Sequence, residues 1–102
     1  MFTGSFAAQG ARGVLAEGGS SRRAEVEKMF ASVGGTLESY YFAFRSDDFF
    51  IIGDLPDNAA AAAAAMTTSA SGAVHARTVA LLTPEEVDRA AKLSPSYRAP
   101  GG

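Results

Sequence analysis

Two consecutive apolar segments decide the fold: residues 36–44 read TLESYYFAF and residues 49–54 read FFIIGD, with the polar RSDD at 45–48 between them. β-Branched and aromatic residues at this density favour β-strands, and a short polar linker between two strands predicts a β-hairpin. An antiparallel strand with one face in water alternates apolar with polar residues. In both strands here, however, the odd and the even positions are apolar alike. We therefore expect both faces of the sheet to be buried. In the first strand, one expected face carries Tyr40, Phe42 and Phe44, and the other carries Leu37, Tyr41 and Ala43.

The segments on either side of the hairpin supply the remaining elements. Pro56 ends the second strand, and Asp57 or Asn58 caps a helix of alanines. Thr83-Pro84-Glu85-Glu86 is a capping box with proline at the first helical position, so a last helix begins there. Before the hairpin we expect a strand within 1–8, a helix over 9–17 and a helix capped by Ser20 or Ser21 and ending at Gly34. After the hairpin we expect the alanine helix over 59–69, a strand over 74–82 and a helix ending near Leu93.

This order contains two split β-α-β units, which predicts an α+β, ferredoxin-like βαββαβ sandwich with an extra C-terminal helix. The helices of such a fold cover one face of an antiparallel sheet. Because the hairpin is apolar on both faces, we expect a second copy of the chain to cover the other face and close a dimeric α/β barrel. Residues 1–93 are expected to form one domain. Residues 94–102, with two Pro and two Gly, are expected to form a flexible tail.

The composition also favours self-association. The chain has 102 residues and is 47% apolar, but 21 residues are Ala, so few large side chains remain for a core. A domain of this size buries roughly two-thirds of its chain surface and is only marginally stable alone. A homodimer or a higher homo-oligomer is therefore the expected assembly.

The net charge and the residue types present exclude several classes of partner and of site chemistry. The formal net charge of −2 lacks the basic excess that nucleic-acid binding usually requires, so we expect no nucleic-acid partner. With no Cys and one His, the chain excludes disulfides, thiolate nucleophiles and a multi-His metal site, and we expect no metal and no cofactor. There is no run of 18 bulky apolar residues and no signal-type N-terminus. We therefore expect no membrane partner and a cytoplasmic location.

A set of short blocks in a fixed order resembles a known family. From about Ser5 to Tyr97 the chain is similar to the small bacterial GYD-domain proteins. The resemblance implies a ferredoxin-like, dimeric α/β-barrel fold and a family without an assigned biochemical role. The blocks are Gln9-Gly10-Ala11-Arg12-Gly13, Arg22-Arg23, Gly34-Gly35, Tyr41-Phe42-Ala43-Phe44, Asp48, Leu55-Pro56-Asp57, Ser71-Gly72 and Leu82-Thr83-Pro84-Glu85-Glu86-Val87.

The motif that gives this family its name is altered in the chain. Gly-x-Tyr-Asp in the hairpin turn corresponds here to Arg45-Ser46-Asp47-Asp48, so only Asp48 is kept. We expect Arg45 to occupy a turn position with positive φ, which costs a non-glycine residue about 1 kcal/mol. Asp47 and Asp48 are expected to form Asx-type hydrogen bonds in the turn.

Four residues are candidates for binding a ligand. His75 and Arg77 lie two apart on a predicted strand, so they face the same way and form a cationic pair suited to a carboxylate or an enolate. Tyr41 can donate a phenolic hydrogen bond into a pocket. Asp54 ends an apolar strand and, if it faces a core, needs a partner such as Arg77 or a backbone donor. The structural alternatives are a solvent-facing strand end for His75 and Arg77, packing for Tyr41 and an ion pair for Asp54.

One further pair of residues is unusual for its position. Arg22 and Arg23 begin a predicted helix, where the helix dipole favours acidic side chains, and this points to an interaction role. The alternative is an ordinary exposed pair of arginines.

Two functions from different classes remain open. The first is a non-enzymatic homodimeric binding or interaction module whose barrel interior or seam takes a small apolar or carboxylate ligand. The second is a cofactor-independent dimeric-barrel enzyme, an isomerase or oxygenase acting on a small carbonyl or carboxylate compound. The second requires Tyr41, Asp54, His75 or Arg77 to polarise the substrate.

Overall fold

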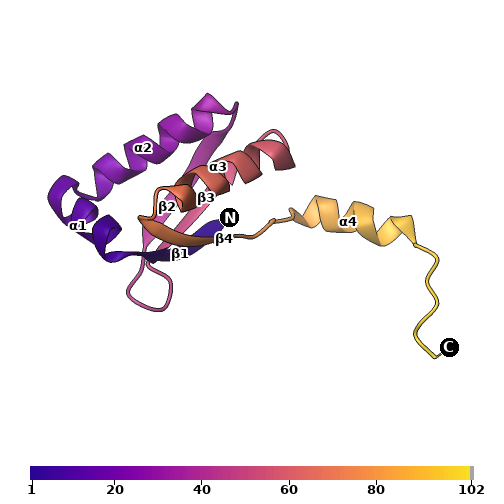
Figure 1. The fold of residues 1–102 in the computed structure, drawn as a ribbon. Helices are drawn as coiled ribbons and strands as arrows, with labels where there is room; N and C mark the ends of the chain where they lie inside the picture. Colours follow the sequence, from indigo (N-terminus) through magenta and orange to yellow (C-terminus); the bar gives the residue numbers. More distant parts are fainter. Residues whose placement is uncertain (102) are drawn as a thin grey trace.

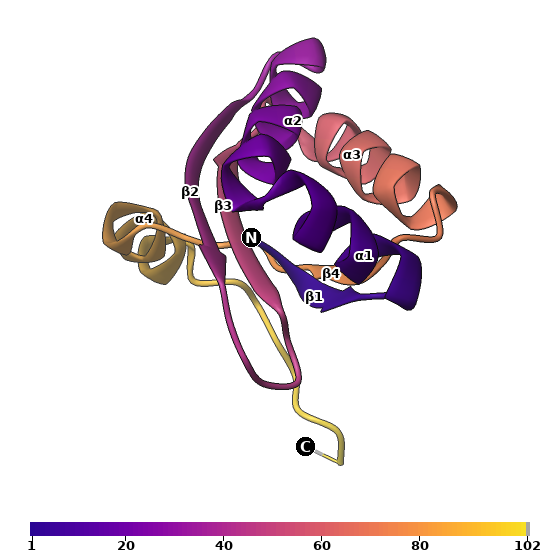
Figure 2. The same cartoon turned by 90° about the vertical axis from the view of Figure 1, so that its left-hand side faces the viewer.

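The computed structural model describes residues 1–101 and forms one four-stranded sheet with helices over one face (Figures 1 and 2). It is an α+β fold whose strands and helices follow the expected order, with two helices between the first two strands as predicted. The elements are β1 (Phe2–Phe6), α1 (Ala8–Glu17), α2 (Gly19–Ser32), β2 (Thr36–Phe42), β3 (Phe49–Asp54), α3 (Asn58–Ala70), β4 (Val74–Thr78) and α4 (Pro84–Leu93).

The strand order is β2-β3-β1-β4, so the N-terminal strand lies in the middle of the sheet. β1 pairs antiparallel with β3 and β4, and β2 pairs antiparallel with β3. The predicted hairpin is therefore present and adds two strands on one side of β1. One line of paired residues crosses all four strands, running through Tyr41, Phe50, Thr3 and Arg77.

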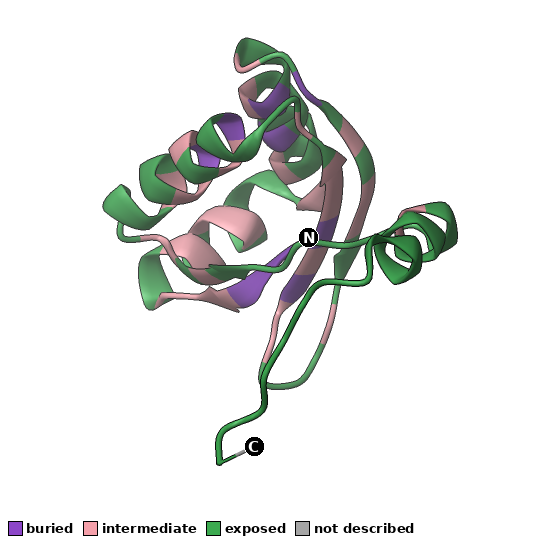
Figure 3. Ribbon diagram, turned by 90° about the vertical axis from the view of Figure 1, so that its right-hand side faces the viewer, coloured by how far each residue is buried: buried purple, intermediate pink, exposed green. Residues whose placement is uncertain are grey.

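The core lies between the sheet and its helices. Phe2, Phe49 and Ile51 of the sheet form one cluster with Val26 and Phe30 of α2. The Phe2 and Phe30 rings lie 5.5 Å apart between centroids, and Phe30 is only 1% exposed. Figure 3 shows the buried segments on the sheet and on the helix surfaces turned toward it. Burial is therefore concentrated on a single face of the sheet.

A β-bulge in β2 changes the faces expected for the hairpin. The register shifts between Leu37 and Ser39, and as a result Leu37 and Tyr40 both pack against the helix-facing core. The expectation that Leu37 shares a face with Tyr41 was wrong. An extra residue in one strand reverses the alternation of its side chains beyond that point.

Two of the predicted helix starts are confirmed. The Asp57 carboxylate caps α3 by accepting a backbone N–H from Ala60 at 2.8 Å. The Thr83 hydroxyl accepts from the Glu86 N–H at 3.1 Å, and the Glu86 carboxylate accepts from the Thr83 N–H at 3.2 Å. Both halves of the capping box are thus formed at α4.

The start of α2 differs from the prediction. Its N-cap is Gly18, with φ 86°, and no side chain caps the helix, so the expected Ser20 or Ser21 cap was wrong. α1 ends at Glu17 and α2 begins at Gly19, which leaves one residue to reverse the chain direction. Glycine fits this position because a side chain rarely tolerates such a positive φ.

The last strand is shorter than the predicted range 74–82. Reciprocal backbone hydrogen bonds join Met1 and Val79 at 2.5 and 2.7 Å, and they end the pairing of β1 with β4. Residues 80–83 lie beyond the end of β1 and have no neighbouring strand in residues 1–101. A strand extends only as far as its partner, so the apolar pattern overstated its length.

Residues 79–93, which we call the C-terminal arm, project from the body (Figures 1 and 3). All of them are exposed except the half-buried Glu86. The radius of gyration is 16.9 Å, compared with about 13 Å for a compact domain of this length. Residues 94–101 are exposed and contain no helix or strand. The flexibility expected of the tail stays a prediction, and Gly102 lies outside the described residues.

The second face of the sheet is open within residues 1–101. α1, α2 and α3 lie together on one side of the sheet, and α4 lies on the other side but stands clear of it (Figures 2 and 3). A single chain thus forms an open sheet with one covered face.

Candidate functional site

The open face carries three of the four predicted ligand-binding residues. Tyr41 and Arg77 lie at opposite ends of the cross-strand line, with Phe50 and Thr3 between them. Three strand spacings of about 4.8 Å separate their backbones by about 14 Å. Tyr41 is 67% exposed, whereas Phe50 is half-buried. The two outer residues are therefore too far apart to hold one small polar group jointly.

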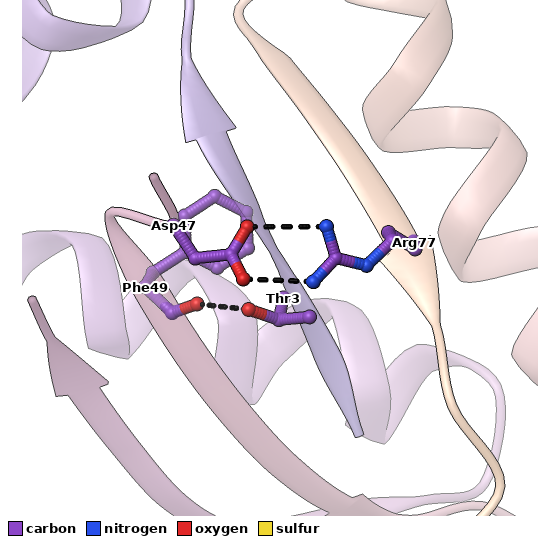
Figure 4. A network of polar contacts seen from close by, with 4 residues as sticks. All are labelled: Thr3, Asp47, Phe49 and Arg77. Carbon is purple, nitrogen blue, oxygen red and sulfur yellow. Dashed lines mark hydrogen bonds and ion pairs between the residues drawn. The ribbon is translucent and has the colours of Figure 1, made fainter. Parts of the chain in front are cut away.

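Arg77 is held by a carboxylate from the hairpin turn. Its two terminal nitrogens donate to the two oxygens of Asp47 at 3.3 and 2.8 Å, in a bidentate pair (Figure 4). The Arg77 side chain is 65% exposed and the Asp47 side chain 16%. Beside the pair, the buried Thr3 hydroxyl donates to the Phe49 carbonyl at 2.9 Å. The polar atoms on this part of the open face are therefore already partnered.

His75 and Arg77 face the same way, as predicted. Both are exposed, while the alternate residues Val74 and Ala76 line the helix-covered side of the sheet. His75 is paired across the sheet with Ser5 of β1. These two residues thus lie at the β4 edge of the open face.

Asp54 lies apart from the other candidates. It is exposed at the end of β3, where it is paired with Thr36 of β2. Asp54 therefore does not face the core, and Arg77 is not its partner. Arg77 is at the level of Phe50, four residues earlier along β3, and binds Asp47 instead.

Asp48, the residue kept from the family motif, joins the hairpin to the central strand. Its carboxylate accepts the Phe6 N–H at 2.9 Å, and its own N–H donates to the Gly4 carbonyl at 2.6 Å. Its carbonyl accepts the Ala43 N–H at 2.8 Å. The expected Asx-type bonds within the turn were wrong, because the carboxylates of Asp47 and Asp48 bind β4 and β1 instead.

The altered motif causes no backbone strain at Arg45. Within residues 1–101, Ser94 is the only non-glycine residue with a positive φ. The expectation of a positive φ at Arg45 was therefore wrong, and the turn accommodates an ordinary side chain there.

A cavity of about 520 Å³ lies on the opposite side of the sheet, beneath α1, α2 and α3. Aromatic side chains from the sheet line it, together with Arg22 from α2 and Tyr40 from β2. The sequence analysis did not predict this cavity, because no sequence motif encodes an empty volume between helices and a sheet. The unfavourable position of Arg22 at a helix start was the one signal that pointed toward it.

Residues 1–101 contain neither a metal-binding cluster nor a membrane-spanning helix. No group of three or more His, Cys, Asp or Glu side chains is arranged to hold a metal ion in this range. No helix in the same range is long and apolar enough to cross a membrane.

Comparison with known proteins identifies the family. No curated protein and no solved structure matches the chain. The family model described as the GYD domain matches residues 1–91, a range that includes all four strands, the Asp48 junction and most of α4. The chain therefore belongs to the GYD domain family.

Proposed function

We propose that this GYD-domain protein is a non-enzymatic homodimeric interaction module. A second copy covers the open face and closes an α/β barrel, whose seam takes a small apolar or carboxylate ligand. The main support for this proposal is the apolar strip that Tyr41, Phe50 and Ile52 form on that face. Apolar area that stays in water contributes nothing to folding, and a partner that covers it gains roughly 25 cal/mol per Å².

The polar groups beside this strip suit the edge of an interface. Protein interfaces combine an apolar centre with a polar rim. On the open face, the Arg77–Asp47 pair lies at the β4 side, and the strip lies over β2 and β3. This arrangement supports a contact centred on the hairpin strands.

The C-terminal arm supplies a second uncovered apolar surface on the same side of the sheet. Leu81, Leu82, Val87 and Leu93 are all exposed along it. A ten-residue helix is marginal in water without packing, even with a complete capping box. A second copy that approaches the open face also meets the arm, so one association covers both surfaces.

The geometry gives less support to the enzyme alternative. Arg77 is engaged by Asp47, and Asp54 lies at the far end of β3. Tyr41 is three strands away from Arg77. A polarising site requires groups that converge on one reacting atom, and these residues do not converge within a chain.

Sedimentation equilibrium on the wild type and on Tyr41→Glu tests the proposed dimer. Tyr41 is exposed in the single chain, so the substitution leaves its fold intact and places a charge in the interface. We expect the wild type to have the mass of two chains and Tyr41→Glu that of one. Met66→Glu is the matched control, because Met66 is equally exposed but lies on α3, in the helical layer. A monomeric wild type, or a Tyr41→Glu variant that stays dimeric, contradicts the proposal.

A further inference from the structure

The cavity under the helices has the size and lining of a small-molecule site. Its volume of about 520 Å³ falls within the range of about 300–1,000 Å³ typical of ligand pockets. Phe2, Phe6, Phe49 and Ile51 form an apolar wall on the sheet side. The cavity lies on the face opposite the proposed dimer interface, so it exists within one chain and does not depend on association.

Small residues keep the cavity open. α1 contributes Gly13 to the lining, and α3 contributes Ala64, whose side chain is a single methyl group. A Cβ added to Gly13 would meet no atom within 4 Å. The space is therefore a consequence of which residues these two helices carry.

The polar residues that line this space include two hydrogen-bond donors on neighbouring elements, α2 and β2. Arg22 of α2 and Tyr40 of β2 are both half-buried. Burial raises the pKa of Tyr40 above its ordinary value, and the charge of Arg22 and its hydrogen bond to the hydroxyl oxygen act in the opposite direction. The phenol is therefore neutral near pH 7 and keeps its proton to donate.

The charge of Arg22 is not neutralised by a carboxylate in residues 1–101. The adjacent Arg23 forms an ion pair with Glu27 at 3.7 Å, and Glu25, which also lines the cavity, pairs with Lys28 at 3.5 Å. Arg22 forms no ion pair of this kind with any described residue. The guanidinium has donors beyond the one that it directs to the phenol oxygen, and the phenol keeps its own O–H donor, so an oxygen atom of a ligand complements both.

We propose that this cavity binds an apolar small molecule carrying one oxygen acceptor, a carbonyl or a carboxylate, which receives hydrogen bonds from Arg22 and Tyr40. The apolar part of the ligand lies against the aromatic wall of the sheet. This site differs from the seam of the proposed barrel.

Three naphthalenes of similar shape test the role of the oxygen acceptor. 2-Naphthoate carries a carboxylate, 2-acetylnaphthalene a carbonyl, and 2-ethylnaphthalene no acceptor. Binding is followed by NMR on the isotope-labelled full chain, which also maps where each probe sits. We expect at least one of the two oxygen-bearing probes to bind about tenfold more tightly than the ethyl compound, since hydrogen bonds to a charged donor contribute about this factor. Shifted resonances should lie on α1, α2, α3 and β2.

Matched variants assign the interaction to residues. Arg22→Met keeps the aliphatic stem and should weaken binding of the preferred probe about tenfold, and Tyr40→Phe should weaken it several-fold. Arg23→Met is the control on the same helical turn, because Arg23 does not line the cavity. Gly13→Leu favours the helix and adds bulk at the cavity wall, so it should reduce binding of all three probes while the chain stays folded.

Several results overturn this inference. One is equal affinity for all three probes, or no detectable binding of any of them. Another is shifts confined to the open face around Phe50 and Ile52. Equal losses of probe affinity in Arg22→Met and Arg23→Met also contradict it. A monomeric wild type that still binds in the cavity would reject the proposed dimer and leave this site standing.

Discussion

The two faces of the sheet are made from the same kinds of residue but have different surroundings. Along β3, Phe49 and Ile51 are buried under the helices, whereas the intervening Phe50 and Ile52 lie on the open face. Since neighbouring side chains of one strand differ in this way, the difference comes from the covering layer and not from the strand itself. An apolar pattern therefore indicates that a face needs cover, but it does not say which molecule supplies it.

The covered face accounts for most of the stability that the single chain can gain. Phe30 enters it from α2 and is almost fully enclosed. The open face gains its full hydrophobic contribution only when a second surface is present. Variants on the two faces should consequently respond differently to protein concentration.

Phe30→Ala should have the largest effect on the free energy of unfolding. Removing this buried ring leaves a cavity in the main core and should cost about 3–5 kcal/mol in urea unfolding of the full chain. Phe50→Ala is the counterpart on the open face and should cost less in dilute protein. Its cost should rise with protein concentration if a second copy covers that face. Equal and concentration-independent losses from the two variants would mean that the faces do not differ as described.

Gly53→Ala should have the next largest effect, because the ring of Phe30 packs directly on the strand at this glycine. A Cβ added there would lie 2.4 Å from Cε2 of Phe30, so the ring would have to shift within the core. Overpacking of this kind should destabilise the chain by about 1–3 kcal/mol. Gly13→Ala, where the added Cβ meets no atom within 4 Å, should instead stabilise by up to about 1 kcal/mol through helix propensity. The reverse order in thermal unfolding would contradict the packing described for Phe30.

The parts of the fold that could be predicted depend on local signals. Residues 36–54 predicted their hairpin, and Asp57 and the Thr83–Glu86 box predicted where two helices begin. Each of these features is decided by side chains within a few residues, which a sequence displays directly.

The parts that could not be predicted depend on contacts between distant segments. The bulge after Leu37 is a property of the pairing with β3, and β4 ends at Thr78, the last residue that pairs with β1. Arg77 was one of the possible partners considered for Asp54, but it binds Asp47 of the hairpin turn instead. The cavity could not be predicted for the same reason, because it lies where three separate helices meet the sheet.

Asp48→Ala tests the link between the hairpin and the central strand. Loss of the carboxylate leaves the partly buried Phe6 N–H without its acceptor, and this should cost about 1–2 kcal/mol in chemical unfolding. Asp48→Asn keeps a carbonyl oxygen at the same place and should recover most of the loss. Identical stabilities for the two variants would show that the hydrogen bond to Phe6 contributes little.

The Arg77–Asp47 pair should have the smallest effect on the free energy of unfolding. It also gives the most specific test of what covers this part of the open face. An ion pair with a side chain that is 65% exposed contributes no more than about 1 kcal/mol, and salt screens it further. A double-mutant cycle with Arg77→Gln and Asp47→Asn, measured on dilute monomer, should therefore give a coupling near the lower end of that range. In the dimer, the second copy removes water from the rim of the open face, so the same cycle should give a larger coupling that depends less on salt. If the coupling and its salt dependence are the same in both states, the pair lies outside the interface, and the contact must be confined to the β2–β3 side of the sheet.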